Sequence, residues 1–252
     1  MSYSCLFDLD GTVYRGQSPI EGAVNFIHRL KKNDIKYKFI TNRSDRSSEE
    51  VSNHLNTMGI ISTPDSIITS AMGVAGLTKG RRVYVLGSDN LRDCIRGSEA
   101  IITGDQPEDV VIGFDGKINF DDIRDVCQKI FLGARFLATN PDVWIQPELG
   151  IVPENCSILA AITSITKIQP IIIGKPNSPM IEIALSDPDI KRDFAVIIGD
   201  NLDTDIAAAN SIGLRSILLL TGVTNSKIAE ASAIKASWIA KDYKALDAIL
   251  FS

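Results

Sequence analysis

Residues 5–12 read Cys-Leu-Phe-Asp-Leu-Asp-Gly-Thr, a short apolar run that gives way to a turn. Cys5–Leu9 predicts a buried β-strand, and Asp10-Gly-Thr12 predicts the turn that ends it. On an extended strand, residues i and i+2 point to the same face, so the Asp8 and Asp10 side chains are expected to lie together, although Asp10 is already close to the turn. Gly11 allows a tight turn, which the Thr12 hydroxyl is expected to fix by a local hydrogen bond.

Strands and helices alternate along the rest of the chain. The expected strands are residues 5–9, 36–40, 82–86, 109–114, 135–138, 170–173, 194–198 and 215–220. The expected helices are residues 23–33, 47–59 and 120–132, one beginning near 178, and one ending at 213. This alternation, which restarts after about residue 79, predicts an α/β fold with parallel strands and covering helices.

Composition narrows the class of protein. The 252 residues are 44% hydrophobic and 23% charged, which fits one large globular domain or two modest ones. The net charge of −5 disfavours a protein that binds nucleic acid through its phosphates. No stretch approaches the roughly 18–20 apolar residues that cross a bilayer, and the N-terminus lacks a secretory pattern, so we expect a cytoplasmic protein without a membrane partner. The four scattered cysteines predict neither a disulfide framework nor a zinc site.

Polar residues follow four of the expected strands, where ligands bind in parallel α/β sheets. They are Asp8 with Asp10, Thr41 with Asn42, Lys175, and Asp200 with Asp205. If these strands are neighbours, the carboxylates repel one another unless a divalent cation lies among them, and oxygen ligands are those that Mg²⁺ prefers. Lysine and backbone N–H groups suit an anion instead. A hard cation beside an anion site points to a phosphoryl group.

The spacing of the first two acids suggests a division of labour. The Asp8 carboxylate can attack phosphorus and form an aspartyl-phosphate, which divides the reaction into two easier steps. Asp10 can protonate the leaving oxygen and later deprotonate the attacking water.

Four ordered motifs resemble those of the haloacid dehalogenase (HAD) superfamily. They are Asp8-Leu-Asp-Gly-Thr12, Phe39-Ile-Thr-Asn42, Gly174-Lys-Pro176, and Ile198-Gly-Asp-Asn-Leu-Asp-Thr-Asp-Ile206. Thr139-Asn-Pro-Asp142 is similar to the NagD/4-nitrophenylphosphatase branch. The resemblance covers essentially the whole chain.

The resemblance implies a role for each motif residue. Asp8 would be the nucleophile and Asp10 the acid/base, while Thr41 and Asn42 would hold the phosphoryl group and Lys175 would neutralise it. Mg²⁺ would be bound by the carboxylates of Asp8 and Asp200 and by the backbone carbonyl of Asp10. Asp205 would support the metal, more often through water than directly.

The resemblance also implies a domain organisation. A Rossmann-like parallel sheet with helices on both faces would form a discontinuous core of residues 1–78 and 171–252. A smaller α/β cap of the family's type 2 would occupy residues 79–170, between the second and third motifs, and would close over the substrate. A homodimer through this cap is one expected assembly.

Simpler interpretations exist for each of these residues. Asp8 and Asp10 could form a solvated turn, Thr41-Asn42 could cap the next helix, and Lys175 could be a surface lysine. Asp203, and in part Asp205, suit the N-terminus of a helix. Asn140 and Asp142 are candidates for the substrate pocket, but Asn-Pro-Asp is also a turn sequence.

Two places depart from the family pattern. Arg43 stands where a small or amide residue is common, and it either faces solvent or binds a carboxylate or second phosphate of the substrate. Residues 150–156 form a less glycine-rich loop than in relatives, so the cap is expected to contact the substrate differently.

The sequence therefore favours a Mg²⁺-dependent phosphatase that acts on a small phosphorylated metabolite. A phosphotransferase that uses the same intermediate is the main alternative. A non-catalytic phosphate- or metal-binding relative is another, although such a protein would be expected to have lost Asp8 or Asp10.

Overall fold

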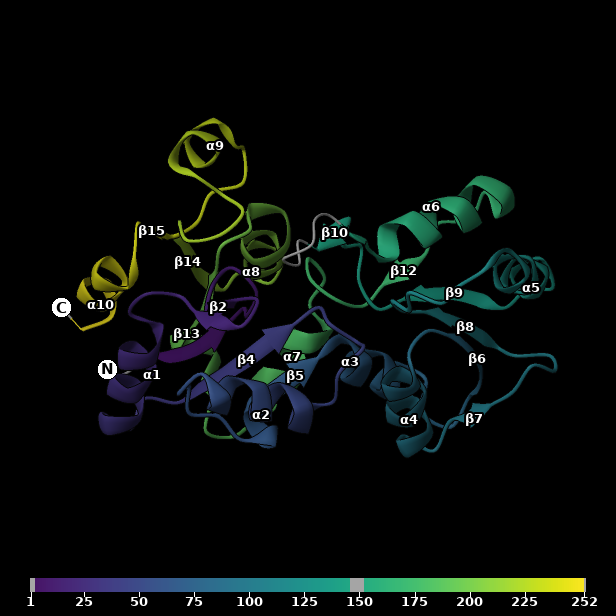
Figure 1. The fold of residues 1–252 in the computed structure, drawn as a ribbon, viewed down its shortest axis with the longest axis horizontal. Helices are drawn as coiled ribbons and strands as arrows, with labels where there is room; N and C mark the ends of the chain where they lie inside the picture. The colour runs from purple at the N-terminus through teal and green to yellow at the C-terminus, as the bar shows by residue number, and fades with distance from the viewer. Residues whose placement is uncertain (1–2, 146–151, 252) are drawn as a thin grey trace. The chain divides into compact units, whose positions relative to one another are not determined.

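A computed structural model describes residues 3–145 and 152–251. Contacts within it divide the chain into two compact units (Figure 1). The first unit comprises Met1–Thr41, Ser48–Ile68 and Lys175–Ser252, and the second comprises Asn42–Ser47 and Thr69–Gly174.

The first unit is built on a six-stranded sheet with the strand order β15-β14-β13-β1-β4-β5. Its strands are β1 (Ser4–Phe7), β4 (Tyr37–Thr41), β5 (Ile67–Thr69), β13 (Ala195–Gly199), β14 (Arg215–Leu219) and β15 (Trp238–Ala240). Strands β15, β14, β13, β1 and β4 pair in parallel. The central strands β1 and β13 are buried along their whole length, as expected for a parallel sheet covered on both sides.

Helices cover both faces of this sheet, as predicted. They are α1 (Ala23–Lys32), α2 (Ser48–Thr57), α7 (Pro179–Leu185), α8 (Ala207–Ser211), α9 (Ser226–Ala231) and α10 (Tyr243–Phe251). Alternate side chains of β1 lie on opposite faces of the sheet. Phe7 belongs to the core formed with α1, α2 and α10, and Leu6 belongs to the core formed with α7 and α8. Short helical turns occupy Pro64–Ser66, Arg192–Phe194 and Leu202–Ile206, and β2 (Tyr14–Arg15) pairs with β3 (Ser18–Pro19) in an antiparallel hairpin.

The second unit has its own five-stranded sheet, with the order β12-β9-β8-β6-β7 and parallel pairing throughout. The strands are β6 (Arg82–Leu86), β7 (Ile101–Ile102), β8 (Asp109–Ile112), β9 (Arg135–Ala138) and β12 (Ile171–Ile172). Helices α3 (Ser70–Leu77) and α4 (Asp89–Gly97) cover one face, and α5 (Phe120–Phe131) and α6 (Asn155–Thr166) cover the other. Strands β10 (Trp144–Ile145) and β11 (Val152–Pro153) form a small antiparallel pair.

The units differ in detail from the domain ranges expected from the sequence. Residues 69–78, expected in the core, belong to the second unit because Ala71 and Val74 of α3 pack with Val83 and Leu91. Residues 42–47 and 171–174 belong to it as well. That this unit acts as a cap stays a prediction.

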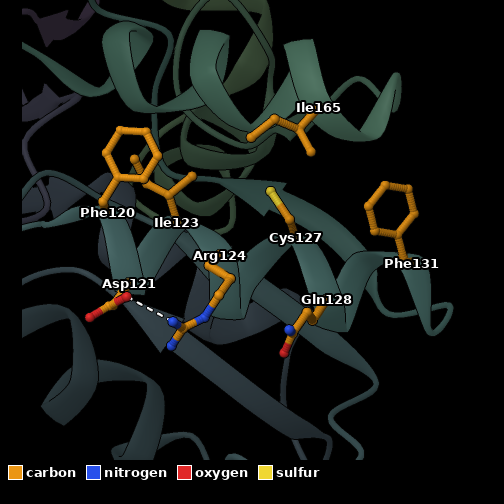
Figure 2. A pocket seen from close by; sticks show the side chains of 8 residues that line it. All are labelled: Phe120, Asp121, Ile123, Arg124, Cys127, Gln128, Phe131 and Ile165. Atoms are coloured by element: carbon orange, nitrogen blue, oxygen red, sulfur yellow. Dashed lines mark hydrogen bonds and ion pairs between the residues drawn. The ribbon is translucent and has the colours of Figure 1, made fainter.

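An open, mostly apolar pocket of about 450 Å³ lies on the second unit. Side chains of α5, from Phe120 to Phe131, line it together with Ile165 of α6, and an ion pair joins Arg124 to Asp121 at its edge (Figure 2). None of the site residues predicted from the sequence lies among its lining residues. Among the helices of the described residues, none is long and apolar enough to cross a membrane.

Asp109 fastens three strands of the second sheet together. Its side chain is fully buried at the start of β8, and it accepts hydrogen bonds from Arg81, next to β6, and from Arg135 of β9. Burial alone would raise the pKa of Asp109, but the hydrogen bonds and charges of Arg135 and Arg81 outweigh it and hold the pKa below its ordinary value.

We predict that Asp109→Asn destabilises the protein by about 2–3 kcal/mol, because two guanidinium groups lose their charged acceptor. Since the folded-state pKa is lowered, the stabilisation is present above the unfolded pKa of Asp and is lost as the pH falls through the folded-state value. Thermal unfolding of both proteins between pH 3 and pH 7 measures this. A stability difference that stays constant over this range would contradict the prediction.

Candidate active site

The carboxyl ends of three adjacent strands bring the predicted site residues of the first unit together. Strand β1 pairs with β4 on one side and β13 on the other, with Phe7 opposite Phe39 and Ile198. Asp8 directly follows β1, Thr41 ends β4, and Asp200 follows β13. The backbone N–H of Asp8 donates to the Ile198 carbonyl at 2.8 Å, which extends the pairing one residue beyond the strand. Parallel pairing therefore gathers residues nearly 200 positions apart.

Lys175 lies at the centre of the charged groups. Its Nζ donates to Oδ1 of Asp8 at 2.5 Å, to Oδ1 of Asp205 at 2.7 Å and to the Ile40 carbonyl at 3.2 Å. Its side chain is 4% exposed, so it is no surface lysine. Burial alone would lower the pKa of Lys175, but the carboxylates of Asp205 and Asp8 raise it above the ordinary value, and the ammonium keeps its charge.

Three carboxylates cluster here, and two of them, those of Asp8 and Asp205, contact this ammonium. Asp8, Asp200 and Asp205 each offer an oxygen, and these oxygens all lie within 4.8 Å of one another. Burial, reinforced by Asp200 and opposed by Lys175, raises the pKa of Asp8 to about 7. Burial first, and the charge of Asp205 next, raise the pKa of Asp200 to about 6. Burial first, and the charge of Asp8 next, raise the pKa of Asp205 to about 6. When all three are ionised, the cluster carries two negative charges beyond the one that Lys175 neutralises.

The structure holds the Asp200 carboxylate in one orientation. Thr12 Oγ1 donates to its Oδ1 at 3.0 Å and the Val223 backbone N–H to its Oδ2 at 2.6 Å. Two glycines leave room for it: a Cβ on Gly222 would lie 1.9 Å from Oδ2, and one on Gly11, where φ is +85°, would lie 2.7 Å away. The sequence predicted a purely local role for Thr12. Its partner is instead 188 residues away, because the turn after β1 faces the end of β13.

Asp205 belongs to the cluster itself. It lies on the π-helical turn Leu202–Ile206, where its Oδ2 accepts from the Asn201 backbone N–H at 3.2 Å while Oδ1 faces Lys175. Asp203 is exposed at the start of the same turn, as expected for an acid at a helix N-terminus.

Asp10 differs from the other acids. It is exposed, and among the described residues it is not one of the three clustered carboxylates. Its Oδ2 accepts a hydrogen bond from the Tyr14 hydroxyl at 3.1 Å. The sequence gives no signal for Tyr14, because nothing in a linear pattern indicates that a turn will return this side chain to Asp10.

Asn42 and Arg43 follow Thr41 directly but group with the second unit. There Asn42 Nδ2 donates to Asp142 Oδ1 at 2.9 Å, and the Asn42 carbonyl accepts from Asn140 Nδ2 at 2.8 Å. The Asn140–Asp142 turn thus fastens the segment that follows β4. The structure does not describe residues 146–151, so only part of the loop 150–156 is seen.

Arg43 is held by a neighbouring acid. Its Nε and Nη2 donate to the two carboxylate oxygens of Asp45 at 3.1 and 3.0 Å. Burial opposes ionisation of Asp45, but Arg43 outweighs it and lowers the pKa of Asp45. Glu154, buried in the same unit, has its pKa raised to about 7 by burial first and by Asp142 and Asp45 next. Acidic groups therefore surround Arg43.

Comparison with known proteins gives matches along the whole chain. The family profile of haloacid dehalogenase-like hydrolases matches residues 5–100, and a HAD-hydrolase-like profile matches residues 172–246. An acid sugar phosphatase of Staphylococcus saprophyticus is 34% identical over 242 residues, which are 94% of this chain and 93% of that protein.

Solved structures are also similar to this chain. The glycerol phosphate phosphatase from Mycobacterium tuberculosis, crystallised with magnesium, has a TM-score of 0.91 at 32% identity, over 97% of this chain and 76% of that one. NagD from E. coli K-12 has a TM-score of 0.90 at 29% identity, over 96% and 98% of the two chains.

Fold, relatives and acidic cluster together define an enzyme that hydrolyses phosphate esters. The chain belongs to the haloacid dehalogenase-like hydrolase family, and its structural likeness extends to NagD, which confirms the resemblance carried by the four sequence motifs.

Proposed function

We propose that this protein is a Mg²⁺-dependent phosphatase that hydrolyses small phosphate monoesters through an aspartyl-phosphate on Asp8. The observation that carries the proposal is the arrangement of Asp8, Asp200 and Asp205 around Lys175 at the carboxyl end of the parallel sheet. A nucleophile, oxygen ligands for a cation and a fixed positive charge lie within one small volume there.

The donor set fits a hard divalent cation. Asp8 and Asp200 would hold it with their carboxylates and Asp10 with its backbone carbonyl, while Asp205 supports the site. The two excess negative charges of the cluster match the charge of one Mg²⁺, and carboxylate oxygens are the ligands it prefers. When bound, the cation neutralises charge on the phosphoryl oxygens.

In the first chemical step, the Asp8 carboxylate attacks phosphorus and the bond from phosphorus to the leaving oxygen breaks. Burial raises the pKa of Asp8 to about 7, and Lys175 opposes this rise because its ammonium favours the ionised form of Asp8. Thr41, Asn42 and Lys175 would hold the phosphoryl group, and Asp10 would transfer its proton to the leaving oxygen.

In the second step, Asp10 takes a proton from water, and the resulting hydroxide attacks the phosphorus of the aspartyl-phosphate. Inorganic phosphate leaves and the Asp8 carboxylate is restored, so protons and atoms balance over the cycle.

The substrate class is proposed from the relatives. One relative is named an acid sugar phosphatase and one structural neighbour a glycerol phosphate phosphatase, so we propose a sugar or polyol phosphate as the substrate. Values of kcat/KM for sugar, glycerol, glycolate, nucleotide and cofactor phosphates would rank the candidates. A cap formed by the second unit and a homodimer through it remain part of this proposal.

Phosphotransfer is the second candidate, since an alcohol and water need the same base. Product analysis with a labelled phosphate donor and added alcohols separates the two activities. Labelled phosphate esters as the main product would identify a transferase, and free phosphate would identify a hydrolase. A non-catalytic role has less support, because Asp8, Asp10, Lys175 and Asp200 are all present.

We predict that Asp8→Asn lowers turnover of 4-nitrophenyl phosphate at least about 10³-fold, because an amide cannot form the acyl-phosphate. The matched control is Asp203→Asn, the same change at the exposed acid near the site, which should keep full activity. Steady-state kinetics with Mg²⁺ and thermal unfolding of each variant measure this. A folded Asp8→Asn protein with normal turnover would refute the assignment of the nucleophile.

We predict that excess chelator abolishes turnover and that Mg²⁺ restores it. Without activity as the readout, Mg²⁺ should raise the Tm of the wild type and of Asp203→Asn, because a ligand that binds only the folded state stabilises it. Asp200→Asn should show a much smaller rise. Equal shifts in all three proteins, or full turnover in chelator, would exclude this metal site.

We predict that Arg43→Ala raises KM for substrates that carry a second anionic group and leaves KM for neutral phosphate esters unchanged. A guanidinium at this position can bind such a group only in competition with Asp45, so a severalfold effect is expected. Arg46→Ala serves as the control for loss of a nearby positive charge. Equal changes in KM for both substrate types would sink the hypothesis.

A further inference from the structure

The turn after β1 returns a tyrosine hydroxyl to the second aspartate of the motif. Tyr14 is 3% exposed, whereas Asp10 is exposed, and the Tyr14 hydroxyl donates to Asp10 Oδ2 at 3.1 Å. A nearly buried phenol thus contacts the carboxylate of an exposed residue.

Backbone hydrogen bonds fix the two residues relative to each other. Gly11 N–H donates to the Tyr14 carbonyl at 2.8 Å, and the N–H groups of Val13 and Tyr14 donate to the Leu9 carbonyl at 2.8 and 3.3 Å. Asp10 and Tyr14 also form a β-bridge. The turn is therefore closed on itself, and it fixes the backbone of Asp10 relative to that of Tyr14.

The tyrosine ring also packs against a histidine. The His54 imidazole of α2 stands edge-on to it, with ring centroids 5.2 Å apart and an angle of 87° between the rings. The His54 ring is placed in turn by a 3.2 Å contact between its Nε2 and the Gly16 carbonyl. Tyr14 begins β2, whose pairing with β3 anchors the same segment.

We propose that Tyr14 is a positioning residue: its hydroxyl holds the Asp10 carboxylate in the orientation that transfers a proton to the leaving oxygen. This inference rests on the proposed function, in which Asp10 is the general acid. An exposed aspartate samples several rotamers, and a displacement of about 1 Å at a reacting group can cost about 10²-fold in rate.

The dependence of kcat/KM on the leaving group distinguishes a positioning role of Tyr14 from a purely structural one. An alkoxide such as that from glycerol phosphate is a poor leaving group and needs the proton from Asp10, whereas 4-nitrophenolate is a stable anion and needs it little. Loss of the tyrosine hydroxyl should therefore slow cleavage of alkyl esters selectively. Because kcat/KM reports only the steps up to formation of the aspartyl-phosphate, it isolates this effect from the later hydrolysis.

The test compares kcat/KM of Tyr14→Phe for glycerol phosphate and for 4-nitrophenyl phosphate. We expect a loss of about 10-fold or more for glycerol phosphate and of less than about 3-fold for 4-nitrophenyl phosphate. The matched control is Tyr37→Phe, which removes another partly buried hydroxyl, bonded to the Ile61 carbonyl, and should change neither value. In an Asp10→Asn background, Tyr14→Phe should have no further effect.

Equal losses for both esters, or an undiminished effect in the Asp10→Asn background, would overturn the inference. His54→Ala leaves Tyr14 in place and removes only its support, so it should give a smaller loss with the same selectivity even if Tyr14→Phe folds poorly. Different results would refute the proposed function. These are a wild-type protein that hydrolyses neither ester, or an Asp10→Asn variant with full turnover of glycerol phosphate. If only the expected effect of Tyr14→Phe is not observed, the proposed function still stands.

Discussion

The charge balance around Lys175 is the constraint on which the rest of the site depends. One buried ammonium contacts the carboxylates of Asp8 and Asp205, and Asp200 lies beside them. Burial first, and the neighbouring carboxylates next, raise the pKa of each carboxyl, and a single lysine leaves two negative charges uncompensated when all three are ionised. The proposed divalent cation would balance these two charges, because it carries two positive charges and prefers carboxylate oxygens as ligands.

Close backbone approach makes this cluster possible. The loops after β1, β13 and β14 meet around Asp200, which takes hydrogen bonds from Thr12 and Val223 and fills the space that side chains on Gly11 and Gly222 would occupy. The glycines are therefore part of the site, although they carry no reactive group. Asp10 has a different support, since a closed turn and the Tyr14 hydroxyl hold it, so Asp200 and Asp10 are oriented by different sets of hydrogen bonds.

Much of the fold and site could be predicted from residues 5–12 and the three later motifs, because polar residues at the ends of apolar runs can be recognised in the sequence alone. The structure has strands where they were expected before these residues. Asp8 and Asp200 directly follow β1 and β13, Thr41 ends β4, and Lys175 comes shortly after β12. The short elements α4 and β15 escaped prediction, since their apolar patterns are too brief to separate from loops. Helix α6 was also missed, although it is as long as α5. Residues 69–78 were expected in the core, but the apolar face of α3 finds its partners in the second sheet.

By itself the sequence determined the parallel α/β class, the order of the motifs and the types of groups that meet at the strand ends, because each depends on local hydrophobic pattern and residue chemistry. Only the tertiary structure decided which groups touch: Thr12 with Asp200, Lys175 between Asp8 and Asp205, Tyr14 on Asp10, and Arg43 on Asp45. The contacts of Thr12 and Lys175 depend on strand order and loop closure, which bring residues far apart in the chain to within hydrogen-bonding distance. The contacts of Tyr14 and Arg43 are local in sequence and depend on how the turns that hold them close. No pattern along the chain records those distances.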